Sequence, residues 1–173
     1  MKTFDAALAE APGMYKAEAG LGQNRRPELH ALMNQRLADA VDLQMQMKQA
    51  HWNVKGPSLV GLRELFDKVS RSVESYVDLI AERIVQLGGI AEGTVRMSVA
   101  RSLLEEYPLT ISEGEAHVEA VIKALSTFSH HVRITVNETM RLNDTDSAVL
   151  FTRISRGIDQ WRGFIETHCQ ATN

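Results

Sequence analysis

The sequence predicts an all-α fold: a bundle of four long helices, with one short extra helix in the crossover between the second and the third. Apolar residues recur at the three- and four-residue spacing of a helix over four long stretches. The prolines at positions 12, 27, 57 and 108 lie outside these stretches or at their edges, as expected for a residue that interrupts helix interiors. No stretch alternates apolar and polar residues as a strand does, so no sheet is expected.

Size and composition bound the organisation of the protein. The 173 residues suit one domain, and we expect a flexible N-terminal tail over residues 1–26 and a bundle domain over residues 27–173. The net charge of −3 argues against a general nucleic-acid binder. Cys169 is the single cysteine, which excludes a disulfide within the chain and favours a reducing compartment. Without a signal-peptide pattern or an apolar run of about 18 residues, we expect a soluble cytoplasmic protein without a membrane partner.

The first two helices are separated by a glycine–proline pair. From residue 27 to about residue 54 the apolar positions have helical spacing, and Gly56-Pro57 ends that run. The second helix is predicted over residues 58–87, and Gly88-Gly89 stops it because glycine readily adopts the left-handed conformation that ends helices.

A long connection and two further helices complete the prediction. Residues 94–106 are expected to hold the short helix. Ser112 and Glu115 have the spacing of a capping box, which predicts that the third helix begins there and continues to about Leu142. After a polar turn, the fourth helix is predicted over residues 147–168. Two long helices, a crossover with a short helix and two more long helices form the layout of a ferritin-like four-helix bundle.

Three acidic residues of the second helix share one face. Asp67 and Asp78 are eleven residues apart, which returns to the same face within about 20°, and Glu82 lies one turn beyond Asp78. Acids on a helix more often form a solvated surface. Asp78 and Glu82 can nevertheless hold one metal ion between them, while Asp67 lies about 16 Å away at about 1.5 Å per residue. One chain therefore cannot bring all three to a single ion.

Two copies of the chain can bring these acids together. If two second helices pack antiparallel about a two-fold axis near residues 72–75, Asp67 of one copy faces Asp78 and Glu82 of the other. His51 ends the first helix and comes to lie beside Asp67 once the chain doubles back. A lone histidine is more often a packed or surface residue, but its position next to these acids favours a ligand. If the acidic face binds metal, it does so at a dimer interface.

Residues 48–89 resemble the Dps family (DNA-binding proteins from starved cells), the twelve-subunit mini-ferritins. The stretch reads KQAHWNVKGPSLVGLRELFDKVSRSVESYVDLIAERIVQLGG, with a His-Trp-Asn turn, an aspartate in the following helix, Asp-x-x-Ala-Glu-Arg and a Leu-Gly-Gly stop. The later segment DSAVLFTRISRGIDQWRGFIE is similar to the last helix of the family. The resemblance covers roughly residues 27–168, and the motifs are specific as a set although each alone is weak.

The resemblance implies a ferroxidase that stores ferric mineral in a dodecameric shell of the bacterial cytoplasm or nucleoid and protects against oxidative stress. His51 and Asp67 of one chain, with Asp78 and Glu82 of its two-fold partner, would be the catalytic residues and the iron ligands. Imidazole with carboxylates suits Fe(II), and hydrogen peroxide would be the preferred oxidant. Trp52 matches a family tryptophan that is thought to quench radicals, although an interface aromatic explains it equally well.

One position departs from the pattern of the family. Where a second histidine is usual, this chain has Arg63, and arginine offers no lone pair to a metal. Arg63 could pair with Asp67, or with Glu82 across the interface, and either contact would place positive charge where a second iron binds. We therefore expect one competent iron site, a weak or missing second site, and slower oxidation than in relatives with both histidines.

Two other functions compete with this one. The first is DNA-coating protection with residual iron chemistry because of Arg63, but acidic residues nearly balance the basic residues of the tail, so we expect weak or no DNA binding at physiological salt. The second is a ferritin or bacterioferritin with its di-iron site inside one bundle. That site needs Glu-x-x-His, and no glutamate of this chain has a histidine three residues later.

Two further features have both a functional and a structural interpretation. Asp144 and Asp146 could line a three-fold pore that admits Fe(II), while capping of the last helix by Asp146 explains the turn without a pore. Gly157 and Gly163 lie inside the last helix, where each costs about 1 kcal/mol relative to alanine. Close contact with a neighbouring helix would explain both glycines.

Overall fold

The computed structural model describes residues 26–56 and 59–170. Most of the predicted tail, including its basic residues up to Arg25, lies outside the described residues, and Arg26 already belongs to the first described helix. The described part contains five helices and no strand: α2 (Arg26–Asn53), α3 (Leu59–Gln86), α4 (Val95–Arg101), α5 (Gly114–Arg141) and α6 (Thr145–Gln170). Among these described helices, none is long and apolar enough to cross a membrane.

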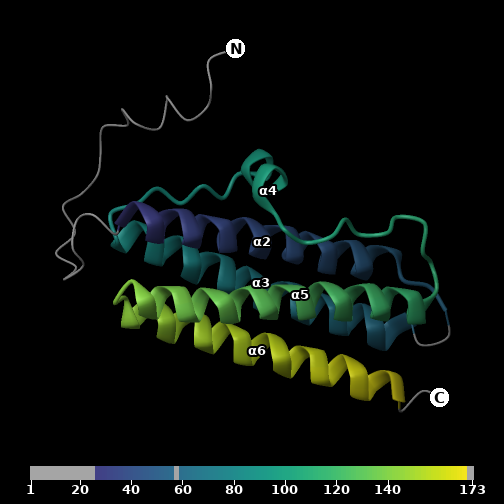
Figure 1. Ribbon diagram of the computed structural model, residues 1–173. Helices are drawn as coiled ribbons and strands as arrows, with labels where there is room; N and C mark the ends of the chain where they lie inside the picture. Colours follow the sequence, from purple (N-terminus) through teal and green to yellow (C-terminus); the bar gives the residue numbers. More distant parts are fainter. Residues whose placement is uncertain (1–25, 57–58, 171–173) are drawn as a thin grey trace.

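The four long helices form two hairpins. α2 packs on α3 and α5 packs on α6, and the hairpins meet through α2 with α5 and through α3 with α6 (Figure 1). The short helix α4 lies outside the bundle against α2, in the crossover between the hairpins. This arrangement confirms the predicted ferritin-like bundle with a short helix between its second and third long helices.

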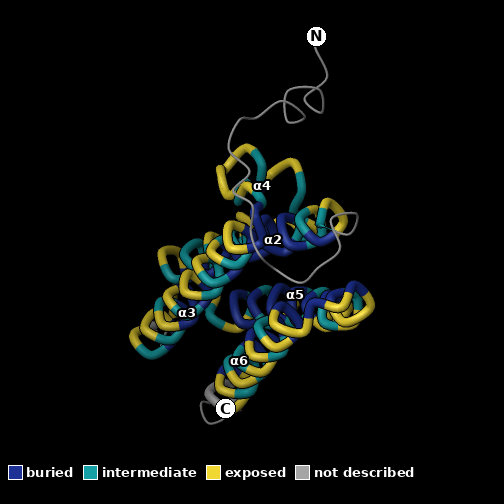
Figure 2. Tube along the Cα trace, turned by 90° about the vertical axis from the view of Figure 1, so that its left-hand side faces the viewer, coloured by how far each residue is buried: buried dark blue, intermediate teal, exposed yellow. Residues whose placement is uncertain are grey.

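The apolar faces of the long helices meet in one core (Figure 2). Leu37 of α2, Phe66 of α3, Phe128 of α5 and Phe151 of α6 have no exposed surface. Each such side chain contributes about 1.5–3 kcal/mol to stability through burial. The spacing of apolar residues therefore orients all four helices, and the outward faces of α3 and α6 stay exposed.

α2 also buries a polar face, because the crossover lies on it. The carboxylate of Asp39 is fully buried, accepts the backbone N–H of Leu103 at 2.9 Å and pairs with Arg36 at 3.2 Å. Gln46 donates to the carbonyl of Glu105 at 3.0 Å. These bonds give hydrogen-bond partners to backbone groups of the crossover, which packing against α2 would otherwise leave unpaired.

The predicted helix stop at Gly88-Gly89 is confirmed in detail, and α5 ends by the same pattern. Gly88 has φ of 81°, and the N–H groups of Gly88 and Gly89 donate to the carbonyls of Val85 and Ile84, both at 2.9 Å. This pattern is a Schellman motif, which needs a left-handed residue just beyond the helix. Asn143, with φ of 61°, ends α5 in the same way.

The capping box at Ser112 and Glu115 was wrong. Glu113 is the N-cap residue of α5, and no side chain caps that end. The carbonyl of Ser112 accepts the N–H of Lys55 at 2.9 Å, so a backbone bridge to the α2–α3 turn holds Ser112 in the crossover. The short helix also ends earlier than predicted, at Arg101, because the following residues bond to side chains of α2.

The two glycines of α6 differ in their surroundings. A Cβ atom on Gly157 would lie 2.0 Å from the hydroxyl oxygen of Tyr76, so α3 and α6 approach closely there. A Cβ atom on Gly163 would meet nothing within 4 Å. The prediction of close helix contact is confirmed for Gly157 and was wrong for Gly163.

Candidate metal centre

His51 lies in the last turn of α2, with its ring fixed by α3. Its Nδ1 atom is 2.9 Å from the carbonyl oxygen of Arg63. A carbonyl only accepts hydrogen bonds, so Nδ1 is the donor, and in the neutral form of the ring Nε2 keeps a lone pair. Metal-binding histidines are commonly oriented by this kind of bond to a backbone carbonyl. The expected position of His51 beside the start of α3 is confirmed.

Asp67 lies one turn further along α3 and is mostly buried, with 17% of its side chain exposed. It accepts a hydrogen bond from the ammonium of Lys48 at 2.6 Å and pairs with Arg71. The bond from Lys48 is the main reason that the pKa of Asp67 lies below its ordinary value; burial opposes the shift, and the charges of Lys48, Arg71 and His51 add to it. His51 and Asp67 therefore lie close enough to interact within one chain.

The cations beside Asp67 are not the one that the sequence suggested. Arg63 was expected to pair either with this carboxylate or with Glu82 across the interface. Lys48 and Arg71 pair with Asp67 instead, and the side chain of Arg63 is exposed, so its pairing with Glu82 stays a prediction. Arg63 contributes through its carbonyl, which any residue at that position supplies. Lys48 was missed, although it lies three residues before His51 and so on the same side of the helix.

Asp78 and Glu82 occupy the exposed face of α3, one turn apart. The rise of a helix, about 1.5 Å per residue, separates Asp78 from Asp67 by about 16 Å. Within the described ranges, no three histidine, cysteine or acidic side chains gather where they could hold a metal ion. Each chain thus carries two separate pairs of candidate ligands, His51 with Asp67 and Asp78 with Glu82.

Asp144 and Asp146 point to different surroundings at the start of α6. Asp144 is buried, and its carboxylate forms an ion pair with the guanidinium of Arg83 at 2.7 Å. The same carboxylate accepts a hydrogen bond from the backbone N–H of Ser147 at 3.2 Å, so Asp144 caps α6. The predicted cap by Asp146 was wrong. The Asp146 side chain is 83% exposed and lies 3.7 Å from Arg83. Of the two carboxylates, only that of Asp146 is free to face a passage for ions, and the pore itself stays a prediction.

Trp52 is exposed to 56% and borders a hollow between α2 and α4. This hollow, called here the α2–α4 groove, has a volume of about 670 Å³. Its apolar lining comes from both helices and from the crossover: Val41, Met45, Trp52, Val95, Val99, Leu104, Tyr107 and Leu109. A groove of this size with exposed apolar walls is typical of a surface that another molecule covers.

Known proteins resemble this chain over most of its length. Residues 30–173 match the ferritin-like domain family. The DNA protection during starvation protein of Agrobacterium fabrum (strain C58) is 33% identical over 156 residues, which cover 90% of this chain and 96% of that protein. The protein of the same name from Mycolicibacterium smegmatis is 24% identical and covers 88% of this chain and 82% of its own length.

Solved structures show the same relationship. DpsA14 from Streptomyces coelicolor superposes with a TM-score of 0.84 at 28% identity, covering 91% of this chain and 94% of its own. The tetragonal form of Mycobacterium smegmatis Dps gives a TM-score of 0.84 at 25% identity, covering 89% and 93%. By fold, by sequence and by the extent of both matches, the chain belongs to the Dps family of ferritin-like proteins.

Proposed function

We propose that the protein is a ferroxidase and iron-storage subunit of a Dps-type dodecameric cage in the bacterial cytoplasm, where it limits oxidative damage. Fe(II) is the substrate, hydrogen peroxide the oxidant and ferric mineral the stored product. The observation that carries the proposal is the bond from His51 to the carbonyl of Arg63, which leaves Nε2 available beside Asp67. Membership of the family supports iron storage and DNA protection in general.

The proposed site joins His51 and Asp67 of one subunit to Asp78 and Glu82 of another. Three carboxylates and one neutral imidazole suit Fe(II), and the oxygen donors favour Fe(III) after oxidation. In the iron-free chain the ammonium of Lys48 occupies one oxygen of Asp67, so Fe(II) has to displace it. The displaced ammonium stays near Asp67 and repels a second cation, which supports a single iron at each site, as expected from the missing second histidine.

The α2–α4 groove supports the shared site. Its exposed apolar side chains include Met45, Trp52, Val95, Val99 and Leu109, each at least 49% exposed in the isolated chain. Trp52 adjoins His51, so a second copy seated on this face also lies next to the proposed ligands. Burial of apolar surface contributes about 25 cal/mol per Å², which favours such pairing.

Mixing two inactive variants tests whether the site is shared. One variant carries His51→Ala and Asp67→Asn, and the other carries Asp78→Asn and Glu82→Gln. Each should lose rapid Fe(II) oxidation when assembled alone. In co-assembled cages, half of the dimers are mixed and each mixed dimer regains one intact site, so about a quarter of wild-type activity should return.

The matched control is Glu119→Gln, an exposed acid of α5 outside the proposed ligand set, which should oxidise Fe(II) at the wild-type rate. Oxidation is followed by the absorbance of the ferric product after addition of peroxide to anaerobic Fe(II)-loaded protein. The shared site is wrong if the mixture stays as inactive as its components while mass spectrometry shows that mixed dimers have formed.

DNA coating is the alternative function, in keeping with the name of the relative from Agrobacterium fabrum. Of the basic residues of the tail that would contact phosphates, all up to Arg25 lie outside the described residues, and the charge of the tail is nearly balanced by acids. We expect weak or no binding by the assembled protein. Retention of DNA in a gel-shift assay above about 150 mM salt, where such contacts are largely screened, would contradict this expectation.

A further inference from the structure

Tyr107 and His117 form a buried hydrogen-bonded pair. Tyr107 lies in the crossover after α4, and His117 lies in the first turn of α5. The phenol oxygen is 2.6 Å from Nδ1 of the imidazole, and the two residues are only 7% and 1% exposed. Burial raises the pKa of the Tyr107 phenol. Burial also lowers the pKa of His117, and the backbone of Asn53 offsets this in part. At neutral pH a neutral phenol thus donates to a neutral imidazole.

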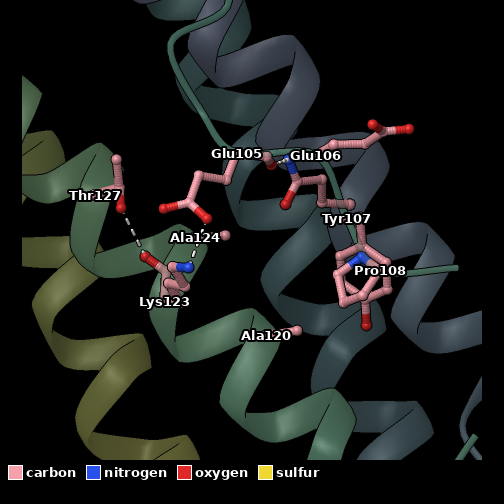
Figure 3. A pocket seen from close by; sticks show the side chains of 9 residues that line it. Glu105, Glu106, Tyr107, Pro108, Ala120, Lys123, Ala124 and Thr127 are labelled. Atoms are coloured by element: carbon pink, nitrogen blue, oxygen red, sulfur yellow. Dashed lines mark hydrogen bonds and ion pairs between the residues drawn. The ribbon is translucent and has the colours of Figure 1, made fainter. Parts of the chain in front are cut away.

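The pair lies near the end of α2 that carries His51. The backbone of Asn53, which influences His117, is two residues beyond His51. Tyr107 lines the α2–α4 groove together with Trp52. It also lines a second pocket of about 220 Å³, which the ion pair between Glu105 and Lys123 borders (Figure 3). The phenol therefore stands between two hollows, close to the turn that carries His51.

This geometry suits oxidation of the phenol. A tyrosine that loses an electron becomes a strong acid, and a cationic radical is costly in an apolar interior, so the proton must leave with the electron. The lone pair of His117 Nδ1 accepts that proton over 2.6 Å without movement of either ring. The hydroxyl of Tyr76 accepts a hydrogen bond from Ser72 at 3.2 Å, and within the described residues no histidine is hydrogen-bonded to it.

We propose that the Tyr107–His117 pair is a redox site that takes up single oxidising equivalents, with His117 as the proton acceptor. The oxidant is a hydroxyl radical, formed when peroxide meets Fe(II), or the radical of Trp52 that it produces. The hydroxyl radical takes one electron, directly or by way of Trp52, and becomes hydroxide; Tyr107 becomes a neutral phenoxyl radical, and its proton moves to His117. A further Fe(II) then returns one electron and becomes Fe(III), and the proton returns from His117 to the phenol.

The net reaction converts one hydroxyl radical and one Fe(II) into hydroxide and Fe(III), and leaves the protein unchanged. The source of the oxidant rests on the proposed function, whereas the oxidation of Tyr107 does not. The experiment therefore has an iron-free arm. In that arm, flash photolysis of a ruthenium polypyridyl complex with persulfate oxidises the full-length, iron-free protein, and electron paramagnetic resonance detects the radical. In the second arm, Fe(II)-loaded protein receives peroxide and is freeze-quenched.

Three variants assign the radical. Tyr107→Phe should abolish the phenoxyl signal in both arms, and Tyr76→Phe should leave it unchanged. His117→Gln keeps an acceptor for the hydrogen bond but removes the base, so radical formation should slow about a hundredfold or more. In wild-type protein, heavy water should also slow radical formation, which tests the role of the proton without any substitution.

Two results would overturn the inference: a phenoxyl signal that survives Tyr107→Phe, or a rate that neither His117→Gln nor heavy water changes. Loss of iron oxidation is a different outcome. If the iron-free arm gives the Tyr107 radical while wild-type protein fails to oxidise Fe(II), the proposed function fails and the redox pair stands.

Discussion

Alanine at position 157 should destabilise the protein, although alanine is the better helix residue. The added Cβ atom would lie 2.0 Å from the hydroxyl oxygen and 3.0 Å from the ring carbon Cζ of Tyr76. Ordinary contact begins near 3.4 Å, so Tyr76 has to move and its hydrogen bond from Ser72 is lost. Overpacking costs about 1–3 kcal/mol and the hydrogen bond about 1 kcal/mol.

Helix propensity offsets part of that cost. Replacing glycine by alanine inside a helix gains about 1 kcal/mol, so Gly157→Ala should lose about 1–3 kcal/mol in total. Gly163→Ala is the matched control in the same helix, because its new Cβ atom meets nothing within 4 Å. It should gain about 1 kcal/mol, which raises the melting temperature of a chain of this size by about 2–4 °C.

Calorimetric melting of both assembled proteins at equal concentration measures the difference. The double variant Tyr76→Phe with Gly157→Ala removes the 2.0 Å contact and keeps the 3.0 Å contact, so it should recover part of the loss. If Gly157→Ala raised the melting temperature as much as Gly163→Ala does, the close approach of α3 and α6 would be refuted.

Three further predictions follow from single contacts. Arg63→His keeps the backbone carbonyl that orients His51 and adds an imidazole ligand. The number of Fe(II) ions bound per interface site, measured by calorimetric titration, should therefore rise from one to two. Two irons per site in the wild type would contradict this reasoning. Asp144→Ala removes the cap of α6 and the closer of the two carboxylates that pair with Arg83, and should cost about 2–4 kcal/mol in chemical denaturation. A loss below about 1 kcal/mol would show that solvent replaces both contacts. The pKa of His117 in the folded state lies below its ordinary value of 6.5, so the unfolded state binds the proton first as the pH falls. The free energy of unfolding should therefore decrease below about pH 6.5, by up to about 1.4 kcal/mol per pH unit. His117→Gln should show a flatter dependence of melting temperature between pH 7 and 5.

The helices could be predicted because their cause is local. Periodic apolar positions, Gly88-Gly89 and the turn at Asn143 each act within a few residues, and the observed ends differ from the predicted ends by a few residues. Errors arose where distant residues decide the outcome. Lys55 holds Ser112 out of α5, and Arg83, which is 61 residues away in sequence, selects Asp144 as its partner at the start of α6.

The candidate site also has features that the sequence predicts and features that only tertiary packing decides. The face shared by Asp67, Asp78 and Glu82 is a property of one helix, and a short turn suffices to bring His51 near it. Lys48 could not be assigned from the sequence, because a long flexible side chain reaches several neighbours and only packing selects one. The buried polar side of α2, with Asp39 at its centre, was also missed, since periodicity does not show that a crossover will cover it.

Each chain carries two halves of the proposed site, His51 with Asp67 and Asp78 with Glu82. The charges of these halves favour pairing of two chains even without iron. Beside His51, one carboxylate, Asp67, faces two cations, Lys48 and Arg71, so this half has an excess of positive charge. The other half, Asp78 with Glu82, carries two negative charges on an exposed helix face. Antiparallel pairing of two α3 helices brings unlike halves together twice, which favours this register over a parallel one. In the proposed dimer, the cations beside Asp67 would lie opposite the carboxylates of the partner subunit. In the proposed mechanism, Fe(II) arrives at a site that is already neutralised and takes over the place of the lysine ammonium, so assembly has to precede iron binding.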